Sequence, residues 1–338
     1  MNGFCQVETY WMDTTAFETT DYSLFFTNRP LKNTNDSTVN FVNKYSGKTD
    51  NIFFAAYDYQ TNEIILKYQA YKTGKNKSYP KGKVSNNIFF RINNEFRGNK
   101  HIKELNIVMS GYGHTFKSQL EYMKQLKITY GDTLSDQSAF LFYAWGDEWR
   151  ISHYDKGKQS AKKAADDFAI IQHMLDEFVT DTLFSEKYPR DFEINLICGS
   201  MGNMLFYKYM QERRKQGIEL VQTYDWIVLV GADVPDNSFD ENKGFNDLNQ
   251  IADSVLLLVN NKDVPLGLSS ELNLHNRLGL VGPSNINSLP GYIIIQNITK
   301  YLTKEDMNRL GHDYFMVNPF VREELIKSTI EKDNPEEK

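Results

Sequence analysis

The chain is 338 residues long, which corresponds to one large domain or two small ones and suffices to bury a core without disulfides or metals. Its 41% apolar and 24% charged residues exclude wholesale disorder, and its formal net charge of −6 argues against a general nucleic-acid-binding surface. The two cysteines, Cys5 and Cys198, cannot form a disulfide framework, and Cys198 lies in an apolar stretch typical of a buried small residue.

Residues 1–20 precede the first strong strand pattern and are interpreted as an N-terminal extension. They lack a basic region followed by an apolar one, so no signal peptide is predicted. No window approaches about 18 uncharged apolar residues, so no transmembrane segment is expected. A cytoplasmic protein is therefore the expectation, and the oligomeric state is left open.

The first hundred residues are mainly of β type. Residues 22–27 form a short apolar run that ends before Asn28, Arg29 and Pro30. Residues 52–60 and 63–71 flank Thr61-Asn62, which predicts a hairpin. Residues 87–92 predict a further strand.

From about residue 105, short apolar strands alternate with amphipathic helices. The predicted strands cover residues 105–110, 139–145, 192–198, 226–230, 254–259 and 292–296, and several lack the polar alternation of a half-exposed strand. One long helical pattern places Phe168, Ile171, Leu175 and Phe178 on one face, and a second helix covers residues 204–213. At the end, Asn318 and Pro319 predict the start of a helix that carries Val321 and Leu325 inward.

This alternation predicts an α/β fold with a mostly parallel central sheet, helices on both faces and antiparallel N-terminal strands. We expect a single domain over residues 21–330, in which residues 21–100 are mainly β and residues 101–330 form the alternating core. Residues 331–338 are interpreted as a charged C-terminal tail. Ligands in such sheets bind beyond the C-terminal ends of the strands.

Residues 194–203 (INLICGSMGN) have the pattern of a nucleophile elbow, in which a buried strand turns sharply into a helix. Cys198 replaces the first glycine of the usual G-x-S-x-G, and it is small enough for the turn. The helix that follows Ser200 would favour a developing negative charge at its N-terminus. Ser200 is the predicted nucleophile. The alternative is an ordinary Gly-Ser turn in which the serine caps the helix.

The elbow pattern predicts the α/β-hydrolase fold. A serine nucleophile needs a base, and in the α/β-hydrolase fold the acid and then the histidine follow the serine in the chain. Only His275 and His312 lie after Ser200. His312 lies in a loop between the last strand and the final helix, where the base of the fold belongs, whereas His275 lies in a polar stretch typical of a surface loop. His312 is the predicted base.

Two aspartates compete for the role of the acid that orients His312. Asp263 follows the next-to-last strand directly, and Asp233 follows the strand before it. Either could instead form a turn or cap a helix. We favour Asp263 and keep Asp233 as the alternative acid.

An oxyanion hole needs backbone N–H groups aimed at the developing charge. The N–H of Met201 is one candidate, and the loop after residues 105–110 supplies Gly111 or Tyr112 as the second donor. The alternative is an ordinary glycine-rich turn. Trp145 and Trp149 could line a substrate pocket, although Trp145 could equally belong to the core. No metal-ligand spacing or phosphate loop is apparent, so no cofactor is expected.

These segments together resemble a bacterial α/β-hydrolase family of unknown function. The shared stretches are LFFTNRPL (24–31), VMSGYGHTF (108–116), FYAWGDEW (142–149), LICGSMGN (196–203), VGADVPDNSF (230–239), LVNNKDVPLGLS (258–269), NRLGLVGP (276–283) and LGHDYF (310–315). The resemblance implies the same Ser200, Asp263 and His312. Two positions depart from the pattern, since Ser110 replaces a usual histidine and Cys198-Gly199 replaces Ala-His.

The sequence therefore predicts a serine hydrolase of the esterase/lipase type that cleaves a carboxylic ester through an acyl-enzyme intermediate. The substrate is expected to be a small-molecule or lipid ester. Two alternatives remain: a hydrolase fold retained as a binding or interaction module, and an acyltransferase that uses the same three side chains.

Overall fold

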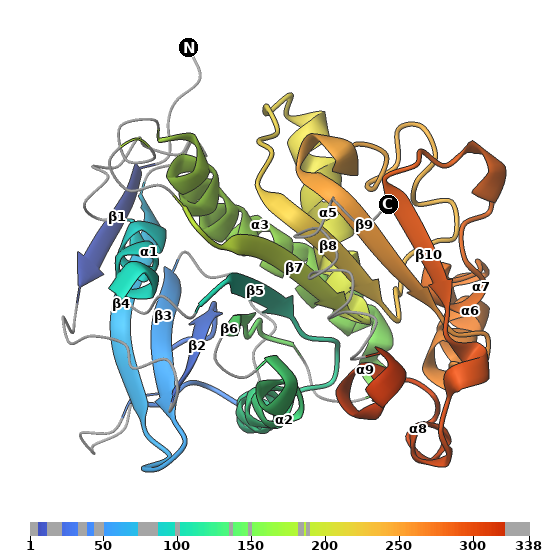
Figure 1. The fold of residues 1–338 in the computed structure, drawn as a ribbon, viewed down its shortest axis with the longest axis horizontal. Helices are drawn as coiled ribbons and strands as arrows, with labels where there is room; N and C mark the ends of the chain where they lie inside the picture. Colours follow the sequence, from blue (N-terminus) through green and yellow to red (C-terminus); the bar gives the residue numbers. More distant parts are fainter. Residues whose placement is uncertain are drawn as a thin grey trace, which may run out of the picture.

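The strands lie in one mixed sheet in a computed structural model of the chain, which describes residues 6–11, 22–32, 39–43, 51–73, 87–98, 102–134, 138–147, 151–181, 186 and 190–321. The described strands form one ten-stranded sheet in the order β1-β4-β3-β2-β6-β5-β7-β8-β9-β10. In Figure 1 this sheet crosses the molecule from β1 at the left to β10 at the right.

The N-terminal part of the sheet is antiparallel, as predicted. Its strands are β1 (Gln6–Trp11), β2 (Tyr22–Thr27), β3 (Asn51–Asp58) and β4 (Ile64–Thr73). The hairpin is formed by β3 and β4, and β1 pairs with β4 as an edge strand. Residues 6–11 thus form the edge strand of the sheet next to β4.

The strand predicted at residues 87–92 is wrong, because this segment begins helix α1 (Ile88–Gly98). The Oδ1 of Asn87 accepts the N–H of Phe89 at 3.0 Å, which is the bond that starts a helix. Ile88, Ile92 and Phe96 are buried at four-residue spacing, so one helical face packs on the core. Residues 87–92 are too few to distinguish the two-residue period of a strand from the 3.6-residue period of a helix.

The remaining strands form the parallel core. They are β5 (Glu104–Met109), β6 (Ser138–Tyr143), β7 (Glu193–Gly199), β8 (Tyr224–Val230), β9 (Ala252–Val259) and β10 (Ile293–Asn297). All neighbouring pairs among them are parallel, and β2 joins them through a parallel pairing with β6. Every residue of β5 is buried, as expected of a strand that is covered on both faces.

Helices cover both faces of the sheet. The longer ones are α2 (Phe116–Leu134), α3 (Tyr154–Thr180), α5 (Met201–Lys215) and α6 (Val264–Asn273). Short ones are α7 (Leu278–Val281), α8 (Lys304–Asn308), α9 (Tyr314–Val317) and the 3₁₀ turns Ile151–His153, Leu248–Gln250, Ile286–Ser288 and Thr299–Tyr301. None of the described helices is long and apolar enough to cross a membrane.

Two hydrophobic clusters show which helices pack on each face of the sheet. Side chains of α1, α3 and α5 belong to one cluster, and those of α2 and α9 belong to the other. Successive residues of β2 alternate between them, with Leu24 and Phe26 in the first and Phe25 in the second. The fold class predicted from the sequence is confirmed. The described chain near the end also follows the prediction, since Oδ1 of Asn318 accepts the N–H groups of Phe320 and Val321. Leu325 and residues 331–338 lie outside the described residues.

Candidate active site

Ser200 occupies a strained turn between β7 and α5. Its φ of 49° and ψ of −121° are rarely adopted by a residue with a side chain. The turn brings the backbone of α5 against β5, because a Cβ on Gly202 would lie 2.7 Å from the carbonyl oxygen of Met109. A small residue at position 202 is therefore a condition of this geometry.

The side chain of Ser200 does not cap the helix, although its backbone occupies the N-cap position. Its Oγ lies 2.9 Å from Nε2 of His312. The capping alternative considered for the sequence therefore does not describe this serine. The structure leaves its hydroxyl directed at an imidazole.

Asn203 holds the elbow in place through its side-chain amide. The sequence contained no indication of this role. It is fully buried, and its Nδ2 donates to the carbonyl oxygens of Cys198 at 2.8 Å, Ser200 at 3.0 Å and Val230 at 3.0 Å. These carbonyls belong to the end of β7, the elbow and the end of β8. One amide thus fixes the turn to both strands that flank it.

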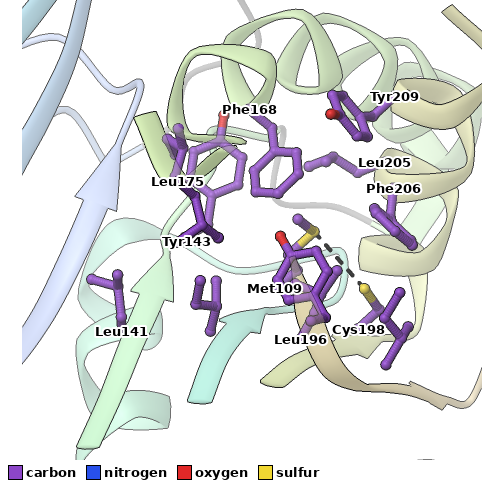
Figure 2. Packing of buried hydrophobic residues seen from close by; sticks show 14 of the residues in the cluster. Met109, Leu141, Tyr143, Phe168, Leu175, Leu196, Cys198, Leu205, Phe206 and Tyr209 are labelled. Atoms are coloured by element: carbon purple, nitrogen blue, oxygen red, sulfur yellow. Dashed lines mark hydrogen bonds between the residues drawn. The ribbon is translucent and has the colours of Figure 1, made fainter. Parts of the chain in front are cut away.

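Cys198 points away from the site into the core. Figure 2 shows its sulfur directed at Met109, whose Sδ lies 4.0 Å away, among side chains that include Leu205 and Phe206 of α5. Burial raises the pKa of the Cys198 thiol well above its ordinary value. The thiol therefore stays protonated, and it does not compete with Ser200 as a nucleophile.

His312 is presented by a tight loop between α8 and α9. Gly311 precedes it with a φ of 64°, and a Cβ there would lie 2.9 Å from the carbonyl oxygen of Lys262. The Nδ2 of Asn260 donates to the carbonyl oxygen of Gly311 at 2.6 Å. The loop that carries the histidine is thus fastened to the loop after β9.

Asp263 lies on the far side of the imidazole from Ser200. Its Oδ2 and Oδ1 lie 2.8 and 2.9 Å from Nδ1 of His312. The same carboxylate caps α6 by accepting the N–H of Leu266 at 2.9 Å. The capping role and the contact with His312 therefore coexist, and the cap fixes the carboxylate in place.

The pKa of His312 is the balance of two opposed effects. Burial of the imidazole lowers its pKa, but the charge of Asp263 and its hydrogen bond raise it, and Asp313 and Asp233 add to that effect. The net result lies above the ordinary value of 6.5. The imidazolium that would form on proton transfer from Ser200 is thus stabilised.

Asp233, the alternative acid, belongs to a different cluster. It accepts hydrogen bonds from Ser269 at 2.5 Å and Tyr154 at 2.8 Å, and it forms an ion pair with the buried Arg277 at 3.4 Å. These partners come from α6, α3 and the segment before α7. Its contact with His312 is electrostatic only, whereas Asp263 makes the direct hydrogen bonds.

The loop after β5 lies over Ser200. A Cβ on Gly111 would lie 2.8 Å from Cβ and 3.4 Å from Oγ of Ser200, so only glycine allows this approach. The ring of Tyr112 turns toward α3, where it packs edge-on against Tyr154 with ring centroids 6.4 Å apart. Met201 opens α5, so no intrahelical carbonyl is available to its N–H.

The structure gives the remaining candidates different surroundings. Trp145 is fully buried and donates its indole N–H to the carbonyl oxygen of Ser110 at 2.9 Å. It therefore lies in the core, as the alternative interpretation had it, and does not line an open pocket. Trp149 lies outside the described residues. His275 is exposed on the segment after α6. Among the described residues, no cluster of three or more acidic, His or Cys side chains has the arrangement to hold a metal ion.

Comparison with known proteins gives a family for this arrangement. Residues 90–329 match the family described as alpha/beta hydrolase of unknown function (DUF900). No curated protein matches the chain. The matched region runs from α1 past α9 and contains Gly111, Ser200, Asp263 and His312.

Proposed function

Because the chain belongs to this α/β-hydrolase family of unknown function, as the resemblance of its motifs indicated, we propose that it is a serine hydrolase acting on carboxylic esters. The observation that carries the proposal is the unbroken hydrogen-bonded series Ser200, His312, Asp263 at the C-terminal ends of the parallel strands. This is the order and geometry in which a serine is made nucleophilic by a histidine base.

The proposed reaction has two halves. Oγ of Ser200 bonds to the ester carbonyl carbon while its proton passes to Nε2 of His312. The carbonyl oxygen takes the negative charge, which the N–H groups of Met201 and of Gly111 or Tyr112 stabilise. The C–O bond to the alcohol then breaks, and His312 returns the proton to the leaving alkoxide. In the second half, His312 takes a proton from water as the water oxygen bonds to the acyl carbon. The bond from that carbon to Oγ then breaks, His312 returns the proton to Oγ, and the acid leaves.

Exposed apolar side chains next to these residues favour an ester with an apolar acyl group. Val264 follows Asp263, and Leu310 lies two residues before His312. Both side chains are exposed, and the N–H of Val264 donates to the carbonyl oxygen of Leu310 at 3.1 Å. Leu268 and Leu272 continue the same stripe along α6 at four-residue spacing. We infer that this exposed stripe, adjacent in sequence to Asp263 and His312, is the surface that an apolar acyl chain on Ser200 would contact.

A fluorophosphonate probe tests the proposal directly. Oγ of Ser200 displaces fluoride from phosphorus, so the wild-type protein should be labelled and Ser200→Ala should not. Intact-protein mass spectrometry measures the added mass, and a panel of esters of increasing acyl length measures the preference for apolar acyl groups. Ser270→Ala, which changes another serine outside the series, should label like the wild type. Labelling that survives Ser200→Ala would contradict the proposal.

A further inference from the structure

The Thr27-Asn28-Arg29 segment at the end of β2 plays no part in the proposed chemistry, yet Arg29 is fully buried. Burying a guanidinium is costly unless its N–H groups find partners. Burial lowers the pKa of Arg29 to about 10, and the charge of Asp147 offsets only part of this effect. The charged guanidinium is therefore buried at an energetic cost, which its hydrogen-bond partners must offset.

Arg29 ties together segments that are distant in sequence. Its Nη2 donates to the carbonyl oxygens of His114 at 3.0 Å and Trp145 at 3.1 Å. Its Nη1 donates to the carbonyl oxygen of Asn43 at 2.8 Å, and its Nε donates to Oε1 of Gln119 at 3.2 Å. The contact with His114 fixes the far end of the loop that begins at Ser110.

Asp147 holds the middle of that loop. Its Oδ2 accepts the N–H of Gly113 at 2.7 Å, and the N–H of His114 adds a second backbone bond. The other carboxylate oxygen lies 4.0 Å from Nη2 of Arg29. Arg29 and Asp147 therefore both bind His114, Arg29 at its carbonyl oxygen and Asp147 at its N–H, and Asp147 also binds the N–H of Gly113.

Gln119 and Trp145 hold the near end of the loop. The Nε2 of Gln119 donates to Oγ of Ser110 at 3.3 Å and to the carbonyl oxygen of Trp145 at 3.1 Å. The indole of Trp145 donates to the carbonyl oxygen of Ser110. Ser110, Gly113 and His114 are thus all bonded to one buried network, and Gly111 is carried between them over Ser200.

We propose that Arg29, with Gln119 and Asp147, is a positioning residue that holds the Ser110–His114 loop so that its backbone N–H groups face the oxyanion formed at Ser200. The inference deepens the proposed function and rests on it. The buried arginine is retained because a displacement of the loop by a fraction of an ångström would misdirect these donors, and such errors reduce rates steeply.

Three variants separate positioning from general stability. Arg29→Met removes every donor but keeps an apolar side chain of similar length, and Arg29→Lys keeps the charge with fewer fixed donors. Arg213→Met is the matched control. Arg213 is also buried, donates to Asp176 at 3.1 Å and to a backbone carbonyl, and lies in α5 away from the loop.

The kinetic readout compares kcat, KM and the inhibition constant of a trifluoromethyl ketone. This inhibitor bonds to Oγ of Ser200 and presents an oxyanion to the loop. For Arg29→Met we expect kcat and inhibitor affinity to fall together by about 10- to 100-fold, with KM nearly unchanged. Arg29→Lys should recover part of the loss. Arg213→Met should lose thermal stability with kcat within about twofold. Equal kcat losses in Arg29→Met and Arg213→Met would overturn the proposal.

Hydrogen–deuterium exchange of residues 110–115 tests the same proposal without catalysis. Exchange should accelerate in Arg29→Met and stay at the wild-type rate in Arg213→Met. Unchanged exchange in Arg29→Met would overturn the proposal even if the enzyme is active. Conversely, accelerated exchange in a protein that the fluorophosphonate does not label would uphold the positioning of the loop while contradicting Ser200 as nucleophile.

Discussion

The nucleophile elbow and the loop that covers it lie against each other but are held in different ways. The elbow is fixed in part by its own neighbours, with Asn203 bonding back to Cys198 and Ser200, and Asn203 and the backbone of Ser200 also bond to the segment at the end of β8. The Ser110–His114 loop is fixed by side chains from three other segments, and Arg29 reaches it across 85 residues of sequence.

The difference shows how much of a site a short motif can contain. A turn whose supports lie within a few residues carries its geometry in its own sequence, as the small residues around Ser200 do. A loop held from a distance has no such signature, because Gly111-Tyr112-Gly113 has the same composition with or without its supports. The elbow is therefore a local device, and the covering loop depends on the assembled sheet.

The largest expected effect concerns Asp263, the acid that orients His312 beside the elbow. Asp263→Asn should lower kcat by about 10³- to 10⁴-fold, because the amide no longer favours the imidazole tautomer that accepts the serine proton. Asp233→Asn should lower kcat by less than about 10-fold and destabilise the fold by about 1–3 kcal/mol, because it weakens a buried network with Arg277. Steady-state kinetics and thermal denaturation of both variants measure these effects.

The two aspartates control for each other, since each is buried at the end of a neighbouring strand. If Asp233→Asn were the variant that abolished turnover while Asp263→Asn stayed active, the acid would be the alternative one, and the hydrogen bonds to Nδ1 of His312 would be structural only.

A smaller effect on turnover is expected from a substitution at the contact between the elbow and the Ser110–His114 loop. Gly202→Ala places a Cβ 2.7 Å from the carbonyl oxygen of Met109 and 2.9 Å from that of Ser110. Both contacts are with backbone, so the elbow and the loop must move apart, at a cost of about 1–3 kcal/mol in the free energy of unfolding. Turnover should fall by about tenfold, since the loop donors move with Ser110.

Gly267→Ala is the matched control for this substitution, because no atom lies within 4 Å of its added Cβ and it lies inside α6. It should be neutral or stabilise the protein by about 0.5–1 kcal/mol through helix propensity. Equal stability losses at both positions would show that the close approach at Gly202 has no special importance.

The sequence predicted the parallel core and the hairpin from local periodicity. From order along the chain it singled out Ser200, His312 and Asp263, whose side chains the structure brings within hydrogen-bond distance. It misassigned residues 87–92, where Asn87 caps a helix that a six-residue segment with four apolar side chains could not distinguish from a strand. It also gave Arg29 no structural role. A buried arginine bonded to loops on either side of it has no pattern in its own neighbourhood, and only the folded sheet brings its partners together.

The smallest expected effect is a shift in the pH dependence of kcat/KM. This shift should follow from changes in charge near His312 and not from changes in the Ser110–His114 loop. His312 must be neutral to accept the serine proton, and its pKa lies above 6.5, so activity should fall with decreasing pH with a midpoint above that value. Asp233 helps to raise this pKa, so Asp233→Asn should lower the midpoint. Gln119→Ala removes a neutral support of the loop, so it should lower the plateau and leave the midpoint in place. If the midpoint moved in Gln119→Ala, the loop would control the ionisation of His312. The idea that charge acts on His312 while the loop acts only through its position would then be wrong.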